Sequence, residues 1–155
     1  MNKKLSDWAS IAEIIASVAV VVTLIVLIIG VRENSALVRA SAYSDNLQSI
    51  SDLQAVILSD PDAVRAYTSF INSDASGLDD EDRMRVLLIL LSMFRSYESA
   101  YFNERYGLLG EQEWERFGGN ICFFLGRALS FGTEGPIRDT VTDEFMTYVE
   151  ERCRD

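Results

Sequence analysis

The segment from Asn72 to Arg83 has the spacing of oxygen-bearing side chains found in calcium-binding loops. Gly77 falls at position 6 of the EF-hand pattern, where the loop must turn sharply, and oxygen donors fall at positions 1, 3, 5 and 9. These donors are Asn72, Asp74, Ser76 and Asp80. Position 12 should be a bidentate glutamate but is Arg83, and a cation there removes two ligands and repels the ion. The alternative, an acidic helix N-terminus after a polar loop, explains the residues more simply, so we expect no bound metal.

A second group that could do chemistry consists of Arg95, Glu98 and Tyr101. Glu98 lies three residues after Arg95 and three before Tyr101, so all three share one face of a predicted helix. A carboxylate beside a tyrosine in a polar pocket suits general acid–base catalysis. The alternative is a partly buried ion pair with an aromatic hydrogen-bond partner that organises the helices. No nucleophile or metal ligand lies nearby, so we expect the structural role.

The chain contains no histidine, and this absence excludes much of the usual catalytic chemistry. Histidine is the commonest general base near neutral pH and the commonest metal ligand. The serines lie in no nucleophile-elbow motif, and no glycine-rich loop stands between a strand and a helix. We therefore predict a protein that is not an enzyme and that binds no cofactor.

The elements that hold these residues begin with a transmembrane helix, which we predict at residues 8–31 after a tail at residues 1–7. The core of the helix, Ile14–Val31, is 18 residues long and carries no charge. At about 1.5 Å rise per residue, the predicted helix is long enough to cross a hydrocarbon core of roughly 30 Å. Trp8 and Arg32 stand at its two ends, where interfacial aromatic and basic side chains belong.

Two other interpretations of this apolar segment fit the sequence less well. A cleaved signal peptide would begin with Lys3 and Lys4 and end at Ala40–Ala42, but its hydrophobic region would run about 7–15 residues and lie next to the cleavage site. A buried core helix would need a second element of comparable hydrophobicity to surround it. Within the span, Glu13 lies close enough to the expected headgroups to stay solvated, and we prefer this to a functional role.

Net charge narrows the list of partners. Beyond residue 31 the chain has 12 basic and 22 acidic residues, so this part carries the whole net charge of −10. Such a surface repels phosphate backbones, so nucleic acid is not an expected partner. Lys3, Lys4 and the α-amino group precede the span, whereas Arg32 and Arg39 follow it. By the positive-inside rule, this difference of one charge slightly favours an acidic domain that faces outward.

Residues 32–58 are predicted to continue as an amphipathic helix or stalk. Apolar and small residues recur there at alternating spacings of four and three, as in a short coiled coil. The resulting oligomer seam would consist of Tyr43, Leu47, Ile50, Gln54 and Ile57. Leu53 and Val56 widen the apolar stripe beyond a strict seam, which favours the alternative that this helix packs on its own domain.

The remainder, residues 59–155, is predicted to be an acidic helical domain, so the fold class is all-α: one span plus a bundle of about four to five helices. Proline, glycine and acidic cap residues divide it into single helices at 61–71, 80–106, 111–131 and 136–153. Gly118-Gly119 inside the third of these permits a close helix approach or marks a kink. Cys122 fits a buried thiol in an apolar run, and a single disulfide with Cys153 is the alternative.

The chain resembles short bacterial membrane proteins of unknown function that consist of one N-terminal span and an α-helical domain. The shared features are the Trp8-x-x-Ile11-Ala12 start, the apolar run, Asp60-Pro61, Tyr97-Glu98 with Tyr101-Phe102, and Gly107-Leu108 before Trp114. The resemblance implies a location in the bacterial envelope and assigns no activity.

These observations lead to two expectations for function. The preferred one is a single-pass protein of the bacterial inner membrane that acts as an interaction module, accessory subunit or oligomeric scaffold, with the lipid bilayer and other membrane proteins or its own copies as partners. The alternative is a membrane-tethered sensor whose helical domain binds a small ligand or a cation.

Overall fold

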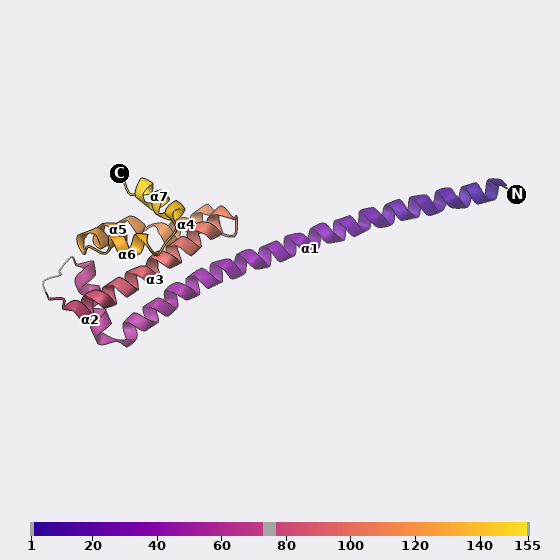
Figure 1. Cartoon of the computed structure of the whole chain (residues 1–155). Coiled ribbons are helices and arrows are strands. Elements are labelled where there is room, and N and C mark those ends of the chain that lie inside the picture. The colour runs from indigo at the N-terminus through magenta and orange to yellow at the C-terminus, as the bar shows by residue number, and fades with distance from the viewer. Residues whose placement is uncertain (1, 73–76, 155) are drawn as a thin grey trace. The chain divides into compact units, whose positions relative to one another are not determined.

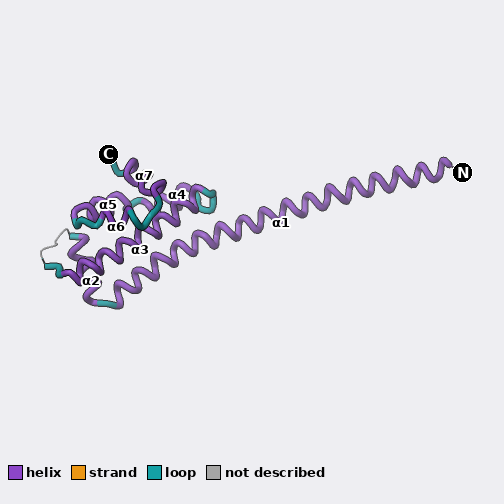
Figure 2. Tube along the Cα trace, in the orientation of Figure 1, coloured by secondary structure: helices purple, strands orange, loops and turns teal. Residues whose placement is uncertain are grey.

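A computed structural model describes residues 2–72 and 77–154; in the first 14 residues it describes the side chains of Trp8 and Glu13 alone. Every regular element in these ranges is an α-helix, as the tube in Figure 2 shows, and the all-α prediction is confirmed there. The chain divides into two units, residues 1–40 and residues 41–155.

The first unit consists of the N-terminal part of helix α1, whose bounds are Asn2–Ser59. Its apolar side chains from Ile15 to Val31 are exposed to the surroundings. The most apolar 18-residue window of Ile15–Ser59 has a mean hydropathy of 2.7, so by length and composition this helix is a candidate membrane span. It is the one such helix in the described residues, which agrees with the prediction of a single span.

Hydroxyl groups within this apolar helix donate hydrogen bonds to the helix itself. Ser17 Oγ, Thr23 Oγ1 and Ser35 Oγ each donate to the carbonyl four residues earlier, at 2.8 Å. In hydrocarbon an unpaired hydroxyl is costly, so this internal pairing makes the polar residues compatible with a span.

The second unit begins at Ser41, which is earlier than the predicted domain boundary at residue 59. The last five turns of α1 belong to it because their inward face is buried against the domain. Tyr43 packs edge-to-face on Phe117, with ring centroids 5.9 Å apart, and Ile57 is buried. The part of the predicted stalk from residue 41 onward therefore packs as a helix of the domain.

Helices α2 (Pro61–Ile71) and α3 (Asp80–Arg105) follow α1, and each begins with an aspartate cap. The carboxylate of Asp60 accepts from the N–H of Asp62 at 3.0 Å, and that of Asp79 accepts from the N–H of Asp82 at 2.8 Å. Such caps satisfy amide groups that the first helical turn leaves without partners. Both helices have the predicted starts.

The predicted helix at 111–131 is wrong in its continuity, because the structure divides it into α4 (Glu111–Gly118) and α5 (Ile121–Ser130). The glycine pair explains the break. A Cβ on Gly118 would lie 2.8 Å from the Trp114 ring, and one on Gly119 would lie 2.9 Å from the Glu115 carbonyl oxygen. Only glycine permits Trp114 to lie this close to the backbone at the turn.

The predicted helix at 136–153 is likewise divided, into α6 (Glu134–Arg138) and α7 (Asp143–Arg152). Thr142 has extended backbone angles, φ −72° and ψ 149°, and its hydroxyl accepts from the Phe145 N–H at 3.4 Å, as an N-cap does. The second unit thus contains more and shorter helices than the four to five that we predicted.

The core of the second unit is rich in aromatic side chains. Helix α3 contacts α2, α4, α5 and α6, and Figure 1 shows it running among them. The largest fully buried side chains of this core include Phe70, Leu90, Phe94, Ile121, Ile137 and Phe145.

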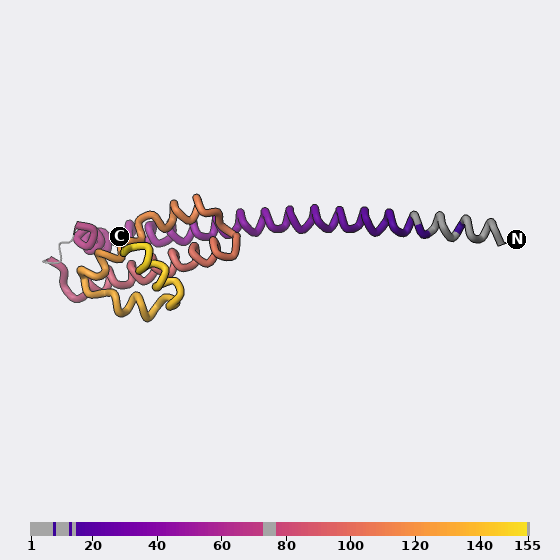
Figure 3. The backbone as a smooth tube through the Cα atoms, turned by 90° about the horizontal axis from the view of Figure 1, so that it is seen from above, coloured from indigo at the N-terminus to yellow at the C-terminus, as the bar shows by residue number. Residues whose placement is uncertain are grey.

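A disulfide links the C-terminal end of the chain to α5. Cys122 and Cys153 are bonded, with Cα atoms 5.2 Å apart, and both views in Figures 1 and 3 show the C-terminus beside the helical bundle. The buried-thiol interpretation of Cys122 is therefore wrong, and the disulfide alternative is the one that the structure contains.

Candidate functional site

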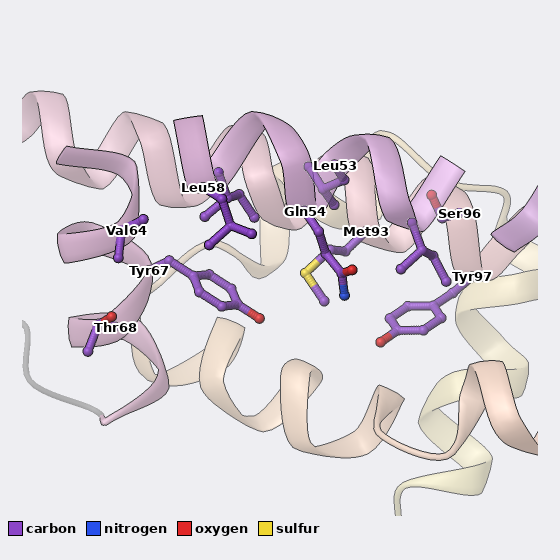
Figure 4. Close-up of a pocket in the computed structure, with 11 residues that line it drawn as sticks. Leu53, Gln54, Leu58, Val64, Tyr67, Thr68, Met93, Ser96 and Tyr97 are labelled. Atoms are coloured by element: carbon purple, nitrogen blue, oxygen red, sulfur yellow. The ribbon is translucent and has the colours of Figure 1, made fainter. Parts of the chain in front are cut away.

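The second unit contains a mainly apolar pocket between the end of α1, helix α2 and the middle of α3 (Figure 4). Its volume is about 360 Å³, within the usual range of small-molecule sites. The apolar lining comprises Ile50, Leu53, Ile57, Leu58, Val64 and Met93. The polar lining comprises Gln54, Tyr67, Thr68, Ser96 and Tyr97. None of these side chains carries a formal charge at neutral pH.

Two tyrosine hydroxyls point into this pocket. Figure 4 shows those of Tyr67 and Tyr97 directed toward one another from opposite ends, with Gln54 and Met93 between them. Tyr97 is only 7% exposed, and among the described residues neither hydroxyl has a hydrogen-bond partner. Among the described residues no buried side-chain oxygen lacks a partner, so both hydroxyls are open to the water in the pocket and are available as donors to a ligand.

Both phenols are protonated at physiological pH, and burial raises their pKa further. Burial raises the pKa of Tyr67 above its ordinary value, and burial together with the neighbouring Tyr67 raises the pKa of Tyr97 to about 12. Both groups are therefore neutral hydrogen-bond donors throughout the physiological range.

The Asp60-Pro61 restart positions one wall of the pocket. Proline at the first helical position ends α1 and starts α2, which brings Val64, Tyr67 and Thr68 toward α3. At the other end, Ser49 Oγ donates to Ser96 Oγ at 3.3 Å and so joins α1 to α3. The pocket is formed where three helices meet at this chain reversal.

Buried Asp82 holds α2 against α3 close to the same wall. Its carboxylate is 2% exposed and accepts two hydrogen bonds from Arg65 on α2, both at 3.0 Å, and one from Arg85 at 3.2 Å. Because Arg65 pairs with this buried carboxylate, its pKa is raised. None of these three residues was among the site residues predicted from the sequence.

The structure divides the predicted polar group: Arg95 and Glu98 line one open surface pocket, whereas Tyr101 lines another. The Glu98 carboxylate accepts from the Thr142 N–H at 2.6 Å, whereas the exposed Arg95 forms no ion pair with a described residue. The buried Tyr101 hydroxyl accepts instead from Arg105 at 2.9 Å and donates to Glu144 at 3.4 Å. Glu98 thus caps α7 and Tyr101 packs among aromatic rings, and within the described residues no hydrogen bond or ion pair joins any two of the three.

Tyr101 belongs to an aromatic cluster that joins α3, α4 and α7. Its ring centroid lies 4.7 Å from that of Tyr148 and 6.0 Å from that of Trp114. The Tyr148 hydroxyl accepts from Trp114 Nε1 at 2.9 Å and from Arg152 at 2.7 Å. Arg152 also donates two hydrogen bonds to Glu115, and these contacts raise the pKa of the guanidinium. The cluster joins three helices of the domain, and Tyr101 and Tyr148 also line an open surface pocket with Glu144.

The predicted calcium loop falls only partly within the described residues. Asn72 ends α2, and Asp80 is the exposed first residue of α3. Asp74 and Ser76 lie outside the described residues, so the loop cannot be assembled as a site. Among the residues that the structure describes, no cluster of three acidic or cysteine side chains is arranged to hold a metal.

The structure divides the residues of the predicted oligomer seam. Tyr43, Ile50 and Ile57 pack against the domain's own core or are buried in it, whereas Leu47 and Gln54 are exposed. The inward three are spaced seven residues apart, so the heptad spacing reflects one face of α1 that covers its own domain. Oligomerisation stays a prediction.

The pocket itself was not predicted, although a signal for it exists. Ile50, Gln54 and Ile57 were assigned to the predicted oligomer seam. Tyr97 was named only in the resemblance, and Tyr67 was not selected as a site residue. Two tyrosines on helices that pack into a core carry hydroxyls that need hydrogen-bond partners. That requirement was the available clue.

No protein-family model, curated protein or solved structure matches this chain.

Proposed function

We propose that this protein is a membrane-anchored binding module whose helical domain holds a small molecule in the pocket between α1, α2 and α3. The observation that carries the proposal is the pair of unpartnered tyrosine hydroxyls, of Tyr67 and the 7%-exposed Tyr97, that point into an apolar cavity of about 360 Å³. An apolar cavity with a few convergent polar groups is the usual form of a ligand site.

The disulfide supports a location for this module on the outer side of a membrane. Disulfides persist in oxidising compartments and are rare in a reducing cytosol, and Cys122–Cys153 closes the end of the same domain. The flank before the span has one more positive charge than the flank after it. By the positive-inside rule, this difference also favours a domain outside the membrane. With the apolar helix as anchor, this fits an inner-membrane protein with its N-terminus inside and its domain outside.

The methyl groups of the methionines offer a direct test of binding. Met93 lines the pocket, Met146 is buried in the core away from it, and Met84 is exposed. We would label the methionine methyl carbons of the full-length protein in phosphatidylcholine nanodiscs and record NMR spectra during titration with a library of small molecules. A saturable shift confined to Met93 is expected. A library in which no compound moves Met93 selectively would overturn the proposal.

Orientation has its own test in intact bacterial cells. A cysteine introduced at exposed Ser130 would reveal the side of the domain by reaction with a membrane-impermeant maleimide. The proposal predicts labelling from outside the inner membrane. Labelling only after lysis would contradict the outward orientation and leave the pocket itself unaffected.

A second candidate function, an interaction module that forms oligomers, is favoured by an exposed stripe on α1. Leu47, Gln54 and Leu58 are spaced seven and four residues apart on one side of the helix, and Leu58 is 74% exposed. Leu47→Asp should dissociate an oligomer that the unsubstituted protein forms in mild detergent. Val56, nine residues away, lies about half a helical turn round, so Val56→Asp is the matched control. A monomeric unsubstituted protein without co-purifying partners would overturn this candidate.

A further inference from the structure

We infer that the pocket between α1, α2 and α3 selects an uncharged, mainly apolar molecule that bears a carbonyl or similar hydrogen-bond acceptor between the hydroxyls of Tyr67 and Tyr97. The inference rests on the proposed function, because it names the class of ligand that the same site takes.

The uncharged lining disfavours ionic ligands. The 11 lining residues are apolar or neutral polar, with no arginine, lysine or carboxylate among them. A carboxylate or an ammonium group that enters an apolar cavity loses its hydration, and no opposite charge in the lining offsets that cost. An anion is disfavoured further by the net charge of −10.

The polar groups of the pocket define what the ligand must offer. The Ser96 hydroxyl donates to the Ser92 carbonyl at 3.1 Å and accepts from Ser49 at 3.3 Å, so it is already paired. The Tyr67 and Tyr97 hydroxyls have no partner among the described residues, and both face the cavity. A protonated phenol is a good donor, and a carbonyl oxygen has two lone pairs and can accept from both.

The Gln54 and Met93 side chains would also contact the ligand in the pocket. The Gln54 side chain lies between the two tyrosines in Figure 4 and can donate or accept. Met93 brings a polarizable thioether on an unbranched side chain, which adapts to the shape of an apolar or aromatic ligand. The apolar body of the ligand would therefore contact Met93 while its acceptor reaches the phenols.

Four compounds of similar size separate the ligand classes. Acetophenone is neutral with an acceptor, ethylbenzene is neutral without one, benzoate is an anion and benzylammonium is a cation. Each would be titrated into the full-length protein in phosphatidylcholine nanodiscs with the Met93 methyl signal as readout, and free concentrations would be corrected with protein-free nanodiscs. Acetophenone should bind about tenfold more tightly than either ion and about fivefold more tightly than ethylbenzene, a difference typical of one or two net hydrogen bonds.

Hydroxyl-deletion variants test the role of the phenols. Tyr97→Phe keeps the ring and removes one of the two donors, so it should lose part of the fivefold preference for acetophenone over ethylbenzene. The double variant Tyr67→Phe, Tyr97→Phe should lose all of it. Tyr106→Phe is the matched control, because Tyr106 is 75% exposed and lies outside the pocket. Unchanged Met84 and Met146 signals would show that each variant is folded.

The results test the ligand class separately from the proposed function, which is that the pocket binds a small molecule at all. Tighter binding of benzoate or benzylammonium, or equal binding of acetophenone and ethylbenzene, would overturn the ligand class while Met93 still reports a site. Failure of all four compounds and of the wider library to move Met93 would overturn the proposed function itself.

Discussion

The carboxylate of Glu98 on α3 accepts a hydrogen bond from the backbone N–H of Thr142, the cap residue of α7, at 2.6 Å. In a capping box, a glutamate three residues into the helix makes this bond to the cap residue. Position three of α7 is Phe145, which cannot accept a hydrogen bond and is buried in the core. Glu98 thus supplies from another helix the acceptor that α7 lacks, and in doing so it joins α3 to α7.

We predict that Glu98→Ala destabilises the domain by about 1–2 kcal/mol, because it removes a helix cap and a favourable charge at a helix N-terminus. Glu98→Gln should cost less, since an amide oxygen can still accept. Hydrogen exchange should show the first turn of α7 opening more readily than α3. Glu104→Gln on the same helix is the control, and an equal loss in that variant would refute the capping role.

Removal of the disulfide should lower the free energy of unfolding by about 3–4 kcal/mol, because the bond closes a loop across a sequence separation of 31 residues. The double variant Cys122→Ser, Cys153→Ser would be compared with the unsubstituted protein by chemical denaturation, with and without reductant. Reductant should destabilise the unsubstituted protein alone. If reductant weakened both proteins equally, its effect would not arise from this bond.

Asp82→Ala should cost about 2–3 kcal/mol, because it removes charge-assisted hydrogen bonds at a site that is 2% exposed. The adjacent Glu81 is exposed and pairs only with Arg85 among the described residues. Glu81→Ala is therefore the control and should change stability by less than about 0.5 kcal/mol. Equal effects in urea denaturation would show that burial of Asp82 contributes nothing.

Gly118→Ala should destabilise the domain by about 1–3 kcal/mol, because the added Cβ would lie 2.8 Å from the rigid Trp114 ring. Gly126→Ala in α5 meets open space and should be neutral or stabilise by up to about 1 kcal/mol, since alanine favours helix. Thermal unfolding monitored by tryptophan fluorescence would compare the two. The reverse order would refute the close packing of Trp114 on Gly118.

Tyr97 should make the domain sensitive to alkaline pH. In the unfolded chain a tyrosine ionises near pH 10, whereas in the folded domain its pKa is about 12, so its contribution is complete below pH 10 and is lost as pH rises toward 12. The loss amounts to about 2 kcal/mol between these limits. Tyr97→Phe should abolish this part of the pH dependence of urea denaturation, with Tyr106→Phe as control. An unchanged alkaline slope in Tyr97→Phe would contradict the raised pKa.

Local sequence signals predicted the features that depend on neighbouring residues. The uncharged run Ile14–Val31 indicates a candidate span by length alone, and Asp60-Pro61 and Asp79 mark helix starts that the structure contains. The heptad spacing of Tyr43, Ile50 and Ile57 correctly identified an inward helix face, but a stripe of apolar residues does not state which surface covers it.

Tertiary structure decided what depends on residues far apart in the chain. Thr142 begins a new helix with help from Glu98, 44 residues earlier, and Cys122 meets Cys153 because α5 and α7 pack together. The pocket likewise exists only where α1, α2 and α3 converge, since Gln54, Tyr67 and Tyr97 are separated by whole helices. The sequence by itself therefore determined the apolar N-terminal helix, the all-α class and the helix starts, which follow from composition, periodicity and caps. Packing determined the breaks, the disulfide and the candidate ligand site, because these arise from contacts that no local pattern encodes.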